Sequence, residues 1–137
     1  MSMALPMAFY VFHIFLIGVL NFLTRSKFAK ERAVKLSYFK TYTGDAPEQM
    51  IVLGRHYDNQ FQVPMLFMIT CLSTYSFQSI NLFAIGLAWI FVATRILHSF
   101  IHIMKNDVLM RAKVYGLGLL CVVGMWVNIL VQMITSP

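Results

Sequence analysis

Polar and charged residues fill the stretch Arg55-His56-Tyr57-Asp58-Asn59-Gln60-Phe61-Gln62-Val63-Pro64, which leads into the apolar run from Met65 to Leu72. In a helix, at about 100° per residue, Arg55, Asn59 and Gln62 would lie within roughly 60° of one another. Pro64 would sit inside that helix, where it removes one backbone hydrogen bond and frees the carbonyl of Gln60. The pattern predicts a kinked helix whose polar face suits a polar ligand.

The composition around this stretch is that of a membrane protein. Of the 137 residues, 59% are hydrophobic and 12% are charged, whereas a soluble domain is roughly half apolar and a quarter charged. The formal net charge is +6, but the basic residues bracket apolar segments, which favours positive-inside topology over nucleic-acid binding. Cys71 and Cys121 show neither a disulfide framework nor metal-ligand spacing, and we expect no metal site.

The first apolar segment, Ala4 to Leu23, carries no charge and is long enough to cross a hydrocarbon core of about 30 Å. No basic residue precedes it and no small-residue cleavage site follows it, so we expect it to remain rather than be removed as a signal peptide. The whole pattern predicts an all-α integral membrane protein of one domain, residues 1–137, with helices at about 4–24, 47–75, 81–104 and 108–134.

Charge predicts the orientation of these helices. The segment from Arg25 to Glu48 carries six cations against three anions, which places it in the cytosol. One of its cations could reach a ligand, but spacing does not say which. Asp45 is placed to cap a helix that begins at Pro47. Four spans with the basic loops inside put both termini outside.

A second set of polar residues lies in the third and fourth expected helices. Spacings of three and seven place Arg95, His98 and His102 on one helical face. Arg111 and Tyr115 lie in the first two turns of the fourth helix. In the predicted topology both groups lie toward the cytosolic leaflet, where the polar face of the second helix also enters. Three separate stretches therefore converge at one depth.

Structural roles remain open for each of these cations taken singly. The alternatives are an Arg55–Asp58 pair, a bond from Arg95 to Asn59 or Gln62, and an interfacial anchor at Arg111.

The set as a whole favours a ligand. Arg55, Arg95 and Arg111 supply three cations, whereas only Asp58 and Asp107 lie close to them in sequence. Arg95 lies about 15 Å along its helix from the inner turn, deep enough that its charge needs a partner. The excess of positive charge predicts a bound anion with several acceptors, such as a carboxylate-bearing peptide or a phosphate head group.

These residues resemble a known family, the membrane-associated proteins in eicosanoid and glutathione metabolism (MAPEG), and in particular its small bacterial members. The resemblance covers nearly the whole chain and combines three short motifs on three successive helices. The matching residues are Arg55, Asn59, Gln62 and Pro64 in the second helix, Arg95, His98 and His102 in the third, and Arg111 and Tyr115 in the fourth.

The resemblance implies a four-helix bundle that forms a homotrimer in the bacterial inner membrane, with glutathione between subunits near the cytosolic leaflet. Arg111 would stabilise the glutathione thiolate, since a free thiol with a pKa of about 8.5 is mostly protonated at neutral pH. The thiolate would attack a lipophilic electrophile or reduce a lipid hydroperoxide. Glutathione itself would be held by Arg55, Asn59, Gln62, Arg95, His98, His102 and Tyr115.

Two positions depart from the family pattern. Gln62 stands where resembling proteins use a carboxylate for the amino group of the peptide, and His102 stands where they use a tyrosine. A non-catalytic protein that binds a lipid or a partner on the same scaffold is therefore an alternative to the enzyme. A small multidrug transporter is a further one, but it would need an acidic residue deep in a span, and every Asp and Glu here lies near or outside the interface.

Overall fold

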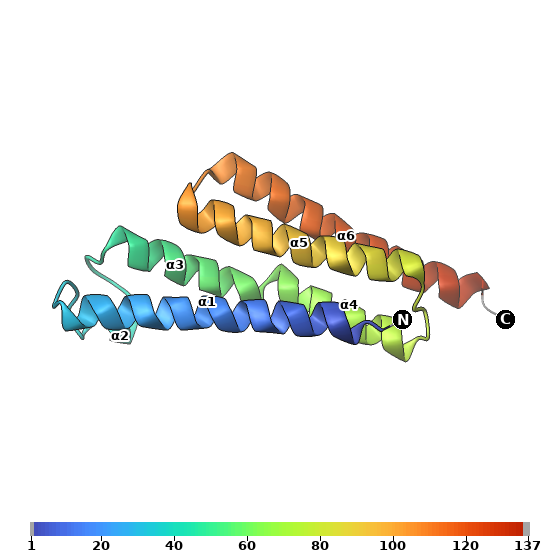
Figure 1. Cartoon of the computed structure of the whole chain (residues 1–137), viewed down its shortest axis with the longest axis horizontal. Helices are drawn as coiled ribbons and strands as arrows, with labels where there is room; N and C mark the ends of the chain where they lie inside the picture. Colours follow the sequence, from blue (N-terminus) through green and yellow to red (C-terminus); the bar gives the residue numbers. More distant parts are fainter. Residues whose placement is uncertain (1, 136–137) are drawn as a thin grey trace.

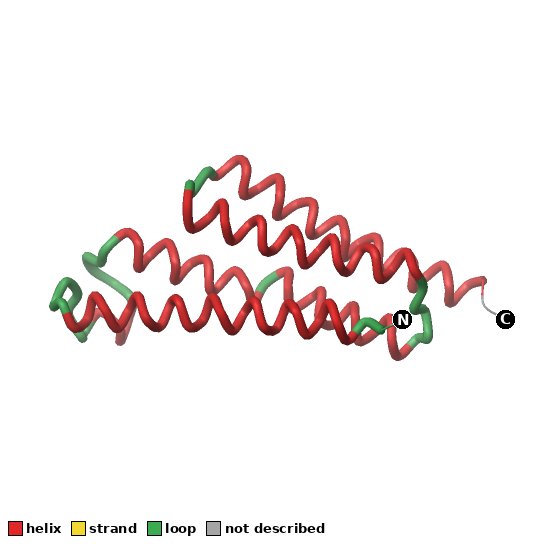
Figure 2. Tube along the Cα trace, in the orientation of Figure 1, coloured by secondary structure: helices red, strands yellow, loops and turns green. Residues whose placement is uncertain are grey.

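The computed structural model describes residues 2–135, and within that range all regular secondary structure is helical (Figure 2). The elements are α1 (Ala4–Lys30), α2 (Tyr38–Thr41), α3 (Glu48–Asp58), the 3-10 turn η1 (Asn59–Phe61), α4 (Val63–Ser76), α5 (Leu82–Met104) and α6 (Val108–Thr135). The long helices follow the apolar runs, and the prolines within them, Pro6 and Pro64, lie in the first turns of α1 and α4.

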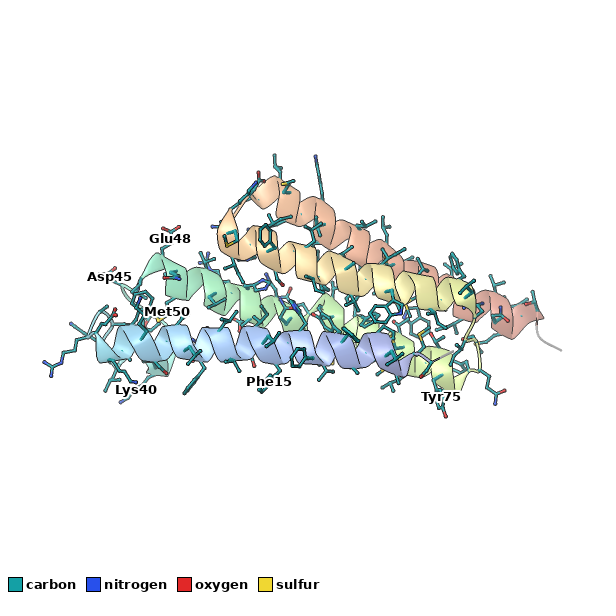
Figure 3. All side chains as sticks on the ribbon, viewed as in Figure 1. Phe15, Lys40, Asp45, Glu48, Met50 and Tyr75 are labelled. Carbon is teal, nitrogen blue, oxygen red and sulfur yellow. The ribbon has the colours of Figure 1, made fainter. Side chains whose placement is uncertain are left out.

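The long helices run along one common direction (Figure 1). α1 lies beside α3 and α5, and α5 and α6 form a hairpin that packs against α1, α3 and α4. The turn between α4 and α5 lies at the same end of the molecule as the start of α1 and the end of α6. The connection from α1 to α3 and the turn from α5 to α6 lie toward the opposite end. Lys40, Asp45 and Glu48 mark that polar end (Figure 3).

The outer surface is apolar, which supports the prediction of a membrane protein. α1, α5 and α6 are each long and apolar enough to cross a membrane. On α1, Phe12, Phe15 and Phe22 are 60%, 63% and 69% exposed, and Phe15 points away from the other helices (Figure 3). Soluble monomers rarely expose contiguous apolar surface of this extent. The protein is therefore a membrane protein.

The predicted single helix over 47–75 is wrong, because the structure divides it into α3, η1 and α4. Gln62, with φ −96° and ψ −106°, separates the two α-helices, and Pro64 lies in the first turn of α4. In a continuous helix the proline ring would clash with the carbonyl of Gln60. In the first turn of a new helix its missing N–H costs nothing, because that donor would have no partner there.

The other boundaries show how charge and capping act on helix ends. α1 continues past the predicted end to Lys30, because a positive residue marks the membrane edge and does not stop a helix. α5 and α6 begin where predicted. Asn81 accepts from the Ala84 N–H at 2.8 Å, and Asp107 accepts from the Met110 N–H at 2.9 Å. These side chains satisfy donors at the helix starts.

The amino end of α3 differs from the prediction. α3 begins at Glu48 after Pro47, and no side chain caps it. The predicted cap by Asp45 is therefore wrong.

An aromatic core joins α1, α4 and α5. The rings of Phe67 and Phe91 stack with centroids 4.1 Å apart, and Tyr10 packs edge-on against both. The Tyr10 hydroxyl donates to Gln60 Oε1 at 2.7 Å. Since Gln60 lies in η1, this buried bond ties the break in the second segment to the core and fixes the residues that flank it.

Candidate functional site

A cleft lies at the polar end of the molecule, where α3 and η1 face the turn between α5 and α6. Its volume is about 500 Å³, within the range of about 300–1,000 Å³ that is usual for small-molecule sites. Its lining residues are Val52, Arg55, Asp58, Asn59, Gln62, His102, Asn106, Val108 and Arg111. Five of the eight residues predicted to form the site therefore line one cleft.

The charges of this cleft favour an anion. Arg55 and Arg111 face it from different helices, and Asp58 is the acidic residue in its lining. Asn59 and Gln62 add amide groups, which both donate and accept hydrogen bonds. Although η1 interrupts the helix, it keeps the predicted polar residues on one side of the chain. The arrangement suits a ligand with carboxylate groups, since a guanidinium group can form a bidentate pair of hydrogen bonds with a carboxylate.

A neighbouring cleft of about 570 Å³ extends the positive surface toward α1 and the long loop. It shares Arg55 and Asp58 with the first cleft and adds Arg25. The Arg25 guanidinium donates to the Tyr42 hydroxyl at 3.1 Å and lies 5.1 Å from the centre of that ring. Of the cations in the basic loop region, Arg25 is thus one that the fold places next to the predicted site.

Two hydrogen-bond acceptors, one at the end of α5 and one in the turn between α5 and α6, set the orientation of Arg111. Its Nη1 donates to His102 Nε2 and to Asn106 Oδ1, both at 2.8 Å. Asn106 has a φ of +50°, a left-handed conformation that asparagine adopts more readily than most residues. The buried Nε atom of Arg111 has no hydrogen-bonding partner among residues 2–135. It is therefore a donor that a ligand could use.

His98 and Tyr115 line a smaller cleft of about 290 Å³, together with Asn59, His102 and Arg111. His98 Nδ1 donates to the carbonyl of Arg111 at 3.3 Å. The His98 and Tyr115 rings lie 5.8 Å apart. Both residues are therefore beside Arg111, but they lie outside the lining of the larger cleft.

Arg95 is the predicted site residue that the fold places differently. It is 2% exposed and lines none of the three clefts described above. Its Nη2 donates to the Tyr115 carbonyl at 3.0 Å, and its guanidinium lies 4.7 Å from the Tyr115 ring and 5.0 Å from the Phe91 ring. Its direct partner is thus the backbone of α6, not Asn59 or Gln62. A ligand role for Arg95 stays a prediction.

Two histidines near the predicted site residues, His56 and His13, were not assigned to the site. His56 belongs to the polar stretch from Arg55 to Pro64, yet it is 0% exposed and bonds to Ser99 of α5 at 2.9 Å. His13 bonds to the same hydroxyl at 2.8 Å. These contacts join three helices, so no spacing within one helix could reveal them. The weak signal in the sequence was a histidine within each of three helices that are otherwise apolar or interfacial.

Comparison with known proteins adds one match. Residues 3–131 match the MAPEG family. No curated protein and no solved structure gives a significant match.

Proposed function

Because the chain belongs to the MAPEG family, we propose that it is a membrane-embedded, glutathione-dependent transferase or peroxidase. Its second substrate is a lipophilic electrophile or a lipid hydroperoxide that reaches the protein from the bilayer. We also propose that each chain forms a four-helix bundle and that three chains assemble as a homotrimer. In this proposal both termini lie outside and the charged loops are cytosolic, in a bacterial inner membrane.

The observation that carries the proposal is the shared cleft of Arg55 and Arg111. The two residues lie far apart in sequence, on α3 and α6, yet both line the same polar space. Glutathione is a tripeptide with two carboxylates, one amino group and one thiol. Two guanidinium groups match its carboxylates or its thiolate, and the amides of Asn59 and Gln62 match its peptide groups.

Arg111 is the proposed catalytic residue. A guanidinium close to the thiol favours the thiolate form, because the charged form gains an opposite charge as its neighbour. The first turn of α6 adds the partial positive charge of a helix amino end. His102 and Asn106 hold the guanidinium in place. The thiolate sulfur then attacks the electrophilic carbon, forms a thioether and expels the leaving group.

The apolar exterior supports a lipophilic second substrate and contacts between subunits. Exposed phenylalanines on α1 and exposed leucines and valines on α6 offer surfaces to lipid or to neighbouring chains. A substrate dissolved in the bilayer would arrive along these surfaces. The family places glutathione between subunits, so a neighbouring chain would complete the cleft.

A conjugation assay on purified protein tests the proposal. With glutathione and a generic aryl halide, we expect turnover above the uncatalysed rate and thiolate absorbance on adding glutathione. Arg111→Ala should abolish the thiolate signal and lower the rate by about 100-fold or more, as loss of a group that stabilises developing charge usually does. Lys113→Ala removes an exposed cation two residues away on α6 and is the matched control. It should keep the thiolate signal and the conjugation rate of the unmodified protein.

The alternative function is a non-catalytic protein that binds a lipid or a partner on the same scaffold. The neutral Gln62 in the cleft favours it, because glutathione then loses a charge-assisted bond to its amino group. Absence of both turnover and thiolate absorbance in the unmodified, trimeric protein would support this alternative and refute the enzyme.

A further inference from the structure

All four histidines of the chain gather in one cluster, although they belong to three different helices. His56 of α3 and the pair His98 and His102 of α5 are buried, and each offers one ring nitrogen within 4.8 Å of the others. The ring centres of His56 and His102 are 4.8 Å apart. His13 of α1 joins the cluster through Ser99. Three imidazoles therefore meet at one buried point.

Each of the three rings engages one nitrogen, and the other has no hydrogen-bonding partner within residues 2–135. The engaged atoms are His56 Nε2 with Ser99 at 2.9 Å, His98 Nδ1 with the Arg111 carbonyl at 3.3 Å, and His102 Nε2 with the Arg111 guanidinium at 2.8 Å. The atoms without a partner are His56 Nδ1, His98 Nε2 and His102 Nδ1. Histidines that bind metals usually donate their second N–H to an acceptor, as His56 and His98 do here. His102 differs, because its Nε2 accepts from Arg111 and its lone pair is therefore engaged.

The hydrogen bonds also indicate where the protons lie. The Ser99 hydroxyl donates to the Arg95 carbonyl at 2.9 Å, so it accepts from His56 Nε2 and leaves the lone pair of that ring on Nδ1. Gln60 donates its amide proton to the His56 carbonyl at 3.1 Å. In this tautomer the 3.2 Å contact between Gln60 Nε2 and His56 Nε2 is not a hydrogen bond, because both nitrogens carry protons. His98 donates through Nδ1 and keeps its lone pair on Nε2. Two buried lone pairs are thus without a donor.

We propose that His56, His98 and His102 form a binding site for a late first-row divalent metal ion of the Zn²⁺ class. Neutral imidazole suits zinc, copper and nickel. Nitrogens around tetrahedral zinc, at about 2.0–2.1 Å from the ion, lie about 3.3 Å apart. The three ligand nitrogens lie within 4.8 Å of one another, so they need to approach by up to about 1.5 Å when a metal binds. Three protein ligands leave a fourth position open for water or an anion.

Arg111 competes with the metal at this site. Its guanidinium donates to the lone pair of His102 that the metal needs, and its charge repels a cation. Metal binding therefore requires Arg111 to release His102. Three neutral imidazoles do not neutralise the charge of the metal ion, so an anion in the fourth coordination position would offset part of it. The site does not rest on the proposed function, since metal binding needs no glutathione.

Metal titration of the full-length protein in detergent, purified through a tag that contains no histidine, tests this site. After a chelator wash, added Zn²⁺ should reach one ion per chain, and added Co²⁺ should give the visible absorption of a tetrahedral site. His56→Gln should weaken zinc binding by on the order of 100-fold. Arg111→Ala should tighten it by about tenfold, because a competing charge is removed.

His13→Gln is the matched control, because His13 contacts Ser99 and none of the three proposed ligands' free nitrogens. It should keep one zinc ion per chain. Circular dichroism and gel filtration confirm that each variant folds, and the Co²⁺ spectrum of the unmodified protein is informative even if a variant does not. Zinc far below one ion per chain, no tetrahedral Co²⁺ spectrum, or equal zinc binding in His56→Gln and the unmodified protein would overturn the proposal.

Discussion

At the scale of single residues, the site depends on side chains that orient one another across a turn. Arg111 bonds to His102 of α5 and to Asn106 of the turn. His102 was predicted to contact a ligand, and the structure adds a partner for it within the chain. A substitution at His102 therefore acts on Arg111 as well as on any ligand.

Gln62 is the residue whose substitution most simply tests the pose of the ligand. In Gln62→Glu, we expect glutathione to bind about fivefold more tightly, since a charge-assisted hydrogen bond to its amino group is roughly twice as strong as a neutral one. Isothermal titration calorimetry measures the dissociation constant. Gln78→Glu, at an exposed position in the turn after α4, adds the same charge elsewhere and should leave affinity unchanged. Equal affinities in both variants would count against the pose.

At the scale of the helices, the contact of α5 with α6 depends on a glycine. A Cβ atom at Gly118 would collide with the buried guanidinium of Arg95 and approach Thr94 Oγ1 to 2.9 Å, whereas a Cβ at Gly116 would meet nothing within 4 Å. The absence of a side chain at Gly118 therefore lets Arg95 lie against α6 and reach the Tyr115 carbonyl.

Paired substitutions test this contact. Gly118→Ala should lower the free energy of unfolding by about 1–3 kcal/mol, the usual cost of overpacking a core. Gly116→Ala should leave stability unchanged or raise it by up to about 1 kcal/mol, because alanine favours a helix over glycine. Unfolding of both variants in the same detergent provides the comparison. A Gly118→Ala variant as stable as Gly116→Ala would show that Arg95 moves aside without cost.

The helices could be predicted from sequence where the physics is local. Hydrophobic runs and the short polar turns between them placed α5 and α6 within a residue of their observed ends. The second segment was harder, because a proline is compatible with either a kink or a new helix. In the structure a new helix, α4, begins at Val63. A buried hydrogen bond between Tyr10 and Gln60 lies at the break that precedes it. Such a contact between distant segments leaves no periodic pattern.

At the scale of the whole molecule, both the exterior and most of the core are apolar. Polar groups gather in a buried cluster between the helices and at one end of the molecule (Figure 3). Arg55, Asn59, Gln62 and Arg111 could be predicted as one group because charged residues at one membrane depth need common partners. The histidine cluster could not be predicted, since it depends on how the helices rotate against one another, and composition does not set that rotation.

The most direct test is an experimental structure of the protein in a lipid nanodisc with saturating glutathione. We expect a trimer with ligand density between neighbouring chains, in contact with Arg55 and Arg111 at the polar end of the helices. Density at this position would confirm that cations from separate helices serve one anionic ligand. Absence of density at saturation, or arginines turned toward lipid head groups or bulk water, would contradict it.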